Sequence, residues 1–124
     1  MTNLSPIEHQ ITFFYTSNLA ETAHFYEKIL GLPLVLDQGS CRIYRTSSNA
    51  AIGFCQKSSV VLVTESVILT LITQDVDAWY QHLIHQEVLF DAPPHENSEY
   101  RIYHCFLRDP NGYRIEIQRF LHAF

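Results

Sequence analysis

Glu116 is the side chain in this sequence best suited to chemistry, because it is the one carboxylate on its face of a predicted strand. Along Tyr113–Phe120, alternation gives an apolar face, Ile115 and Ile117, and a polar face, Arg114, Glu116 and Gln118. In a functional interpretation, this carboxylate accepts a proton or anchors a ligand's donor group or a cation. In a structural interpretation, Arg108 or Arg114 pairs with Glu116 on an ordinary sheet surface.

The turn before this strand sets which residues lie beside Glu116. Asp109 can bond its own backbone, Pro110 fixes φ, and Gly112 accepts a positive φ. That order predicts a type I turn with a glycine bulge between two antiparallel strands. The resulting register opposes three pairs of residues: Arg108 with Arg114, Phe106 with Glu116, and His104 with Gln118.

The composition limits the class of protein. The chain has 124 residues, 47% of them hydrophobic, which is enough for one domain with a buried core. A net charge of −5 without a basic stripe argues against nucleic-acid binding. Pro6, Glu8 and His9 replace the apolar core of a signal peptide, and no apolar run is long enough to span a bilayer. We therefore expect a cytoplasmic protein with no membrane partner.

The three cysteines, Cys41, Cys55 and Cys105, are odd in number and lack CxxC spacing. For a cytoplasmic chain this pattern predicts reduced, buried thiols. Cys55 could act as a nucleophile only beside a base, and the alternative is a small core residue.

The two halves of the chain repeat one order of elements. In the first half, Asn18 is a cap for a helix over Leu19–Leu30 that ends at Gly31, and strands are predicted at Ile11–Tyr15, Leu34–Asp37, Arg42–Arg45 and Ala51–Gln56. In the second half, Asp75 caps a helix, and strands are predicted at Val67–Thr73, near Val88–Phe90, and at Arg101–Arg108 and Tyr113–Phe120.

Two groups of short motifs connect this pattern to a known family. The first half contains Asn18-Leu19, Phe25-Tyr26 and Leu30-Gly31-Leu32, and the second ends in Asp109-Pro110-Asn111-Gly112-Tyr113 and Ile115-Glu116-Ile117. In combination they resemble the vicinal oxygen chelate superfamily, which includes glyoxalase I, bleomycin-resistance proteins, fosfomycin-modifying enzymes and extradiol dioxygenases. Asn18 replaces the usual Asp and keeps its capping role.

The resemblance covers nearly the whole chain and implies an α+β fold. Residues 1–124 would form a single domain of two βαβββ modules, about 1–60 and 61–124. The curved mixed sheets of the modules would enclose a cup, with the helices on the outer face, usually within a homodimer.

The resemblance also names four positions where metal-using members take ligands, which here are Ile11, Gly53, Ile68 and Glu116. Because three of these side chains offer no lone pair, we expect no metal of the family type and no cofactor. His9 lies two residues before Ile11 and could replace a missing ligand. His82 and His85 are three residues apart on the second helix and could share a cation, although we expect both to face solvent.

Strand parity then assigns the lining of the cup. The first module contributes Ile11, Phe13, Tyr15, Gly53 and Cys55, and the second contributes Ile68, Thr70, His104, Phe106, Arg108, Arg114, Glu116 and Gln118. An apolar, aromatic lining with a few polar groups is typical of a small-molecule site.

Three functions fit these observations. The first is a metal-independent binding protein, similar to the bleomycin-resistance branch, that holds a small aromatic or cationic molecule in the cup. The second is an enzyme, a metal-dependent lyase or isomerase or a dioxygenase of the glyoxalase type, with displaced ligands such as His9 or His104 beside Glu116. The third is an interaction domain whose cup is filled by Phe13, Tyr15 and Phe106. The sequence leaves the choice between binding and catalysis open.

Overall fold

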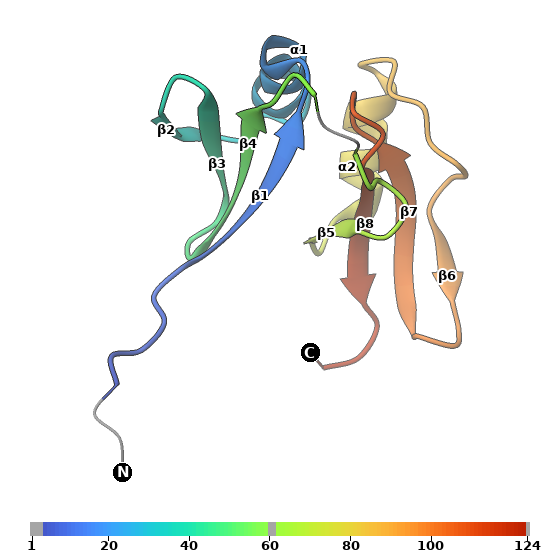
Figure 1. Ribbon diagram of the computed structural model, residues 1–124. Coiled ribbons are helices and arrows are strands. Elements are labelled where there is room, and N and C mark those ends of the chain that lie inside the picture. The colour runs from blue at the N-terminus through green and yellow to red at the C-terminus, as the bar shows by residue number, and fades with distance from the viewer. Residues whose placement is uncertain (1–3, 60–61, 124) are drawn as a thin grey trace. The chain divides into compact units, whose positions relative to one another are not determined.

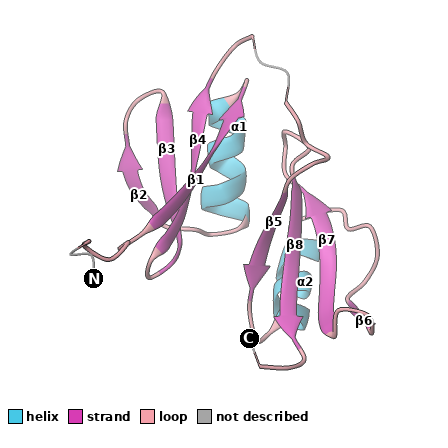
Figure 2. Cartoon of the chain, turned by 60° about the horizontal axis from the view of Figure 1, so that its bottom comes forward, coloured by secondary structure: helices cyan, strands magenta, loops and turns pink. Residues whose placement is uncertain are grey.

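The protein is an α+β chain that divides into two compact units, Met1–Val60 and Val61–Phe124. A computed structural model describes residues 4–59 and 62–123 (Figure 1). Each unit is a four-stranded mixed sheet with a helix on one face (Figure 2). The predicted fold class and the repeated βαβββ order are therefore confirmed. Within the described residues, no helix has both the length and the apolar character needed to cross a membrane.

The first unit is built around a sheet in the order β1-β4-β3-β2. Its strands are β1 (Gln10–Thr16), β2 (Leu34–Asp37), β3 (Cys41–Ser47) and β4 (Ala50–Gln56). The outer strand β1 runs parallel to β4, and the other pairs are antiparallel. This arrangement needs a crossover between β1 and β2, and the helical segment supplies it.

The helical segment begins and ends where the sequence predicts. The Asn18 side chain accepts a hydrogen bond from the backbone N–H of Glu21 at 3.0 Å, which caps α1 (Leu19–His24). The helix continues as a π-helical turn, η1 (Phe25–Ile29), in which the Leu30 N–H donates to the Phe25 carbonyl. Gly31 follows with φ of 75°, a left-handed conformation that glycine adopts without strain.

Aromatic rings fill the core between this helix and its sheet. The Tyr26 ring stacks on Phe54 with 4.4 Å between ring centroids, and the Tyr44 ring lies 6.1 Å from Tyr26 and 6.5 Å from Phe54, so the three rings form one cluster. All three side chains are completely buried. The residues that alternate with Phe54 and Tyr44 point to the opposite side of the sheet. We call the side of each sheet opposite its helix the open face.

The second unit repeats this topology with the order β5-β8-β7-β6. Its elements are β5 (Ile68–Ile72), α2 (Val76–Ile84), β6 (His95–Asn97), β7 (Ile102–Arg108) and β8 (Arg114–Phe120). The Asp75 side chain caps α2 by accepting a hydrogen bond from the Ala78 N–H at 3.0 Å. The core between α2 and the sheet contains the buried side chains Leu83, Cys105, Leu107, Ile115 and Ile117.

The β7–β8 turn has the predicted construction. The Asp109 carboxylate accepts from the N–H groups of Asn111 and Tyr113 at 2.9 Å each, and Gly112 has φ of 91°. The predicted register is confirmed, because Phe106 pairs with Glu116, and the flanking pairs agree: His104 with Gln118 and Arg108 with Arg114.

The prediction of a strand near Val88–Phe90 is wrong. The third strand of the second sheet is β6, which pairs His95 with His104, whereas Phe90 makes a single isolated bridge to Leu107. The segment His95-Glu96-Asn97 has no alternation and low β propensity, so only the backbone of β7 determines its conformation.

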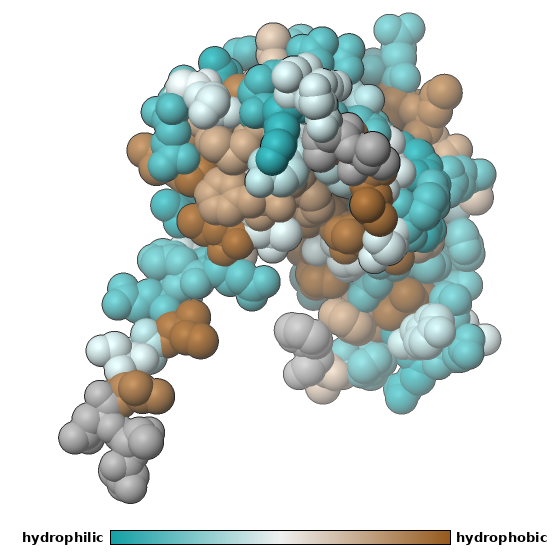
Figure 3. All heavy atoms as spheres, in the orientation of Figure 1, coloured by the Kyte–Doolittle hydropathy of each residue, from teal (hydrophilic) through white to brown (hydrophobic). Residues whose placement is uncertain are grey.

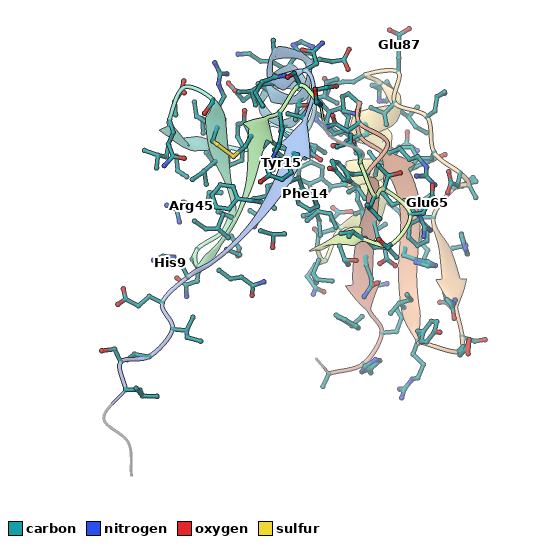
Figure 4. The ribbon with its side chains drawn as sticks, viewed as in Figure 1. His9, Phe14, Tyr15, Arg45, Glu65 and Glu87 are labelled. Atoms are coloured by element: carbon teal, nitrogen blue, oxygen red, sulfur yellow. A yellow bond between two sulfur atoms is a disulfide. The ribbon has the colours of Figure 1, made fainter. Side chains whose placement is uncertain are left out.

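The prediction that Cys41 and Cys55 are reduced thiols is also wrong, because they form a disulfide (Figure 4). They lie directly opposite each other on β3 and β4, with 4.1 Å between their Cα atoms. Their sequence separation of 14 does not show this juxtaposition, which depends on the register of the hairpin. Cys105 is a buried free thiol, as predicted.

Candidate functional site

Glu116 lies on the open face of the second sheet and is held by three side chains. Its Oε2 atom is 2.6 Å from His104 Nδ1, and its Oε1 atom accepts a hydrogen bond from the Thr70 hydroxyl at 2.8 Å. In the orientation that satisfies its hydrogen bonds, the Gln118 amide nitrogen donates to both carboxylate oxygens, at 2.8 and 3.1 Å. The three donors come from three adjacent strands, since β8 lies between β5 and β7.

His104 is the only ion-pair partner of Glu116 among the described residues, so the structural interpretation based on an arginine is wrong. The Arg108 guanidinium instead pairs with Glu65 at 3.0 Å and donates to the Gly112 carbonyl. The Arg114 guanidinium lies over the Phe106 ring, 4.6 Å from its centroid. The position of Glu65 in the chain is labelled in Figure 4.

The pairing with Glu116 sets the orientation of the His104 ring. Nδ1 is used by the carboxylate, and in the described residues nothing is hydrogen-bonded to Nε2. The ring edge packs against the Phe106 ring at 5.0 Å, and the His95 ring lies at 5.1 Å on the neighbouring strand. Both His104 and Glu116 are buried, with exposed fractions of 6% and 7%. A buried imidazole with one nitrogen fixed is able to accept or donate a hydrogen bond at the other.

A pocket of about 540 Å³ opens over this group, lined entirely by the second unit. Its apolar walls are Ile68, Ile102, Phe106 and Phe120. Its polar lining is Asn97, Tyr100, His104, Glu116 and Gln118. This combination of apolar walls with a few converging polar groups is the usual makeup of a small-molecule site.

Four of these lining residues were not among the predicted ones. Ile102 and Phe120 share the parity of His104 and Glu116, so extending each strand by one alternation would have identified them. Asn97 and Tyr100 come from β6 and the turn after it. The sequence carries no signal for them, because the strand itself is not recognisable from its residues.

The open face of the first sheet contains the remaining predicted residues. Ile11, Phe13 and Tyr15 alternate along β1 and are each about half exposed. Apolar side chains gather over the strands of this unit in the face shown in Figure 3. Ile11 lines a smaller pocket of about 310 Å³ with Ile43 and Leu36, and the Lys57 ammonium lies over the Tyr15 ring at 4.7 Å.

Two features of this face limit its chemistry. A Cβ atom added at Gly53 would lie 2.5 Å from the Phe13 ring, so this ring occupies the space that a larger side chain would need. Cys55 is bonded to Cys41, which removes the thiol that could have acted as a nucleophile. The predicted site residues therefore form two groups, one on each sheet, and the ionisable pair lies on the second.

The other candidate groups do not line the pocket over Glu116, although His9 lines the pocket beside Ile11 on the first sheet. His82 on α2 and His85, which follows the last residue of that helix, are exposed and contact Gln86 and the Gln81 carbonyl respectively. His9 is exposed just before β1. Burial raises the pKa of Cys105 to about 12, with smaller contributions from Asp77 and Glu116, so this thiol is a poor nucleophile at neutral pH.

Comparison with known proteins identifies the family. Residues 9–117 match the Glyoxalase/Bleomycin resistance protein/Dioxygenase superfamily. The chain belongs to this superfamily. No protein with a curated description is detectably similar to it in sequence.

Several solved structures share the fold at low sequence identity. A glyoxalase/bleomycin resistance protein/dioxygenase from Nocardioides is 14% identical with a TM-score of 0.79, over 99% of this chain and 89% of that one. Lactoylglutathione lyase from Agrobacterium tumefaciens is 18% identical with a TM-score of 0.73, over 93% and 95% of the two chains. TioX from Micromonospora sp. ML1 is 13% identical with a TM-score of 0.75, over 90% and 97%.

The residues of this chain do not fit the metal centre used by some members of the superfamily. Of the four corresponding positions, Ile11, Gly53 and Ile68 have no donor atom, and the oxygens of Glu116 are engaged by protein donors. Among the described residues, no three His, Cys, Asp or Glu side chains are grouped so as to hold an ion. Structural Zn²⁺ sites need four ligands and catalytic ones three, so no step is assigned to a metal.

Proposed function

We propose that this protein binds a small aromatic molecule, without a metal, in the pocket on the open face of its second sheet. The observation that carries the proposal is the use of Glu116. In a metal site this carboxylate would point a lone pair at the ion, but here it accepts hydrogen bonds from Thr70, His104 and Gln118. Its role is to hold the side chains of Thr70, His104 and Gln118 in position at the polar end of the pocket.

The lining of the pocket supports an aromatic ligand. Phe106 and Phe120 offer ring surfaces, and Tyr100, which is 63% exposed, contributes a third ring. Offset or edge-to-face contacts between rings contribute about 0.5–1.5 kcal/mol beyond the burial of area. A cationic group on the ligand would also be attracted by these rings and by Glu116.

The alternative functions receive less support. An enzyme with displaced metal ligands would need His104 and Glu116 to face a common ion, whereas they face each other at 2.6 Å. An interaction domain with a filled pocket would not leave about 540 Å³ open beside Phe106.

A thermal-shift screen tests this proposal. Purified protein, treated with EDTA, is heated with a panel of planar aromatic and cationic compounds, and in parallel with Ni²⁺, Mn²⁺ or Zn²⁺. We expect some aromatic compounds to raise Tm, because a ligand bound only by the folded state at about 100 times its Kd stabilises by about 2.7 kcal/mol. The variant Tyr100→Ala should weaken this effect, and the variant Leu89→Ala, a control at a site 88% exposed, should not. Stabilisation by the metals alone would overturn the proposal.

We also propose that the protein is a homodimer. The open face of the first sheet exposes Ile11, Phe13, Tyr15 and Leu36, and patches of this kind mark interaction sites in soluble proteins. Sedimentation equilibrium at micromolar concentration should give twice the chain mass, and Phe13→Glu should lower it. A monomer at all concentrations would contradict this proposal.

A further inference from the structure

We infer that the pocket selects aromatic ligands that carry a hydroxyl or N–H donor, and that His104 Nε2 is the acceptor that selects them. The inference rests on the proposed function, because it names the chemistry of the ligand at the same pocket. It assigns His104 the role of specificity-determining residue and Glu116 that of a positioning residue.

The first step is the tautomer of His104. An ionised carboxylate only accepts hydrogen bonds, so the 2.6 Å contact with Glu116 Oε2 requires a proton on His104 Nδ1. In the neutral ring the other nitrogen, Nε2, then carries a lone pair and accepts. In many metal sites a carboxylate bonded to one imidazole nitrogen fixes the tautomer and the orientation of the ring. Glu116 does the same for His104 here, without a metal.

The second step is the rigidity of this arrangement. Glu116 is fixed by Thr70 from β5 and by Gln118 from its own strand, so it cannot follow a movement of the ring. The ring also contacts the Phe106 and His95 rings, at centroid distances of 5.0 and 5.1 Å. The His95 Nδ1 contacts the Pro93 carbonyl at 3.0 Å, which holds that second imidazole in place.

The third step is the contrast between the polar acceptor atom, His104 Nε2, and the apolar walls of the pocket. His104 is 6% exposed and lines a pocket whose walls are mainly apolar, and the described residues provide no donor to Nε2. Nε2 is not among the buried unpartnered atoms of the described residues, so it is accessible from the pocket. A ligand that donates to Nε2 satisfies this acceptor, whereas an analogue without the donor displaces water from it and leaves it unpaired. Sites built to bond a ligand hydroxyl reject the analogue that lacks it, because unpaired buried polar groups are costly.

The charges around the pocket argue for a neutral donor over an anion. Glu116 is paired with His104 and lines the pocket beside it, and none of the described residues that line the pocket is an Arg or a Lys. A phenolate or carboxylate bound at His104 would therefore place its charge near that of Glu116 without a lining cation to balance it. A neutral aromatic alcohol or amine-type N–H avoids this repulsion.

The experiment uses two naphthalene probes of nearly the same shape, 2-naphthol and 2-methoxynaphthalene. The full chain is treated with EDTA, and the Kd of each probe is measured at pH 8 by calorimetry. We expect 2-naphthol to bind at least about ten-fold more tightly, the ratio that one retained hydrogen bond gives. In His104→Phe, which keeps a ring and removes the acceptor, the ratio should fall to about one. Phe106→Leu should raise the Kd of both probes and keep the ratio of the two Kd values.

Each outcome has a distinct meaning. Equal binding of the two probes by the unmodified protein would overturn the inference and leave the proposed function standing. An unchanged ratio in a folded His104→Phe variant would also overturn it. Binding of neither probe would count against both. The ratio in the unmodified protein decides the question even if the His104 variant does not fold.

Discussion

At the scale of single residues, Glu116 illustrates how neighbours decide the use of a carboxylate. Its two oxygens receive hydrogen bonds from three side chains, so it is suited to hold His104 in place. The strand parity and the turn Asp109–Gly112 were enough to predict its face and its cross-strand neighbour. The choice of His104 over Arg108 or Arg114 was not predictable, because it depends on side-chain conformations and on the register of β5.

Replacing Glu116 by Gln should destabilise the protein. An amide presents one acceptor oxygen and one N–H₂ group, so Thr70, His104 and Gln118 can no longer all donate to this side chain in their present orientations. We expect a loss of about 1–3 kcal/mol, measured by urea unfolding. The control Glu65→Gln removes the pair with Arg108 at an exposed position and should cost about 0–1 kcal/mol. Equal losses in both variants would contradict this role of Glu116.

Gly53 is explained by the ring that covers it. The variant Gly53→Ala would put a Cβ atom 2.5 Å from the Phe13 ring, so this half-exposed ring must shift, at a cost of about 1 kcal/mol, the lower end of the range for overpacking. In the Phe13→Ala background the same change should be neutral or stabilising, because alanine restricts the unfolded chain more than glycine does. A double-mutant cycle with no coupling energy would show that Phe13 does not occupy this space.

At the scale of elements, the residues that begin and end helices and strands were the most informative part of the sequence. The caps Asn18 and Asp75, the terminator Gly31 and the turn at Gly112 correctly predicted where the helices begin and where β7 meets β8. The strand β6 was missed because its residues are polar and lie at the sheet edge. Its place is determined by pairing with β7, a contact that local sequence does not encode.

The two helix caps offer a matched prediction in the two units. Asn18→Ala and Asp75→Ala each remove one side-chain acceptor for a helix N–H, and each should cost about 1 kcal/mol of unfolding free energy. Asp75→Asn keeps an acceptor and should cost less. Thermal unfolding followed by circular dichroism provides the measurement. If Asp75→Asn lost as much as Asp75→Ala, the cap would not be the source of the stability.

At the scale of the whole molecule, the repeated topology and the family were predictable, and the covalent link in the first unit was not. The disulfide closes a loop with a sequence separation of 14 between Cys41 and Cys55. In the chain-entropy treatment a loop of this length contributes about 3 kcal/mol. The expectation of reduced thiols followed from an expected cytoplasmic location, and the register of β3 with β4 overrides it.

Thiol counting and reduction test this link. Under denaturing conditions a chromogenic disulfide reagent should find one thiol, Cys105, and three after reduction. The native protein should react slowly, because burial raises the pKa of Cys105 to about 12. Reduction should lower the unfolding free energy by about 3 kcal/mol. Three reactive thiols before reduction would contradict the disulfide.

The most direct test of the central claim is a titration of ¹⁵N-labelled protein with 2-naphthol in EDTA, followed by backbone amide resonances. A metal-independent site on the second sheet predicts that shifts concentrate in β6, β7 and β8, around His104, Phe106 and Glu116, while the core of the first unit stays unchanged. If these resonances stay in place in EDTA and respond only once Zn²⁺, Ni²⁺ or Mn²⁺ is supplied, the protein is a metal-dependent member of its superfamily and the claim is wrong.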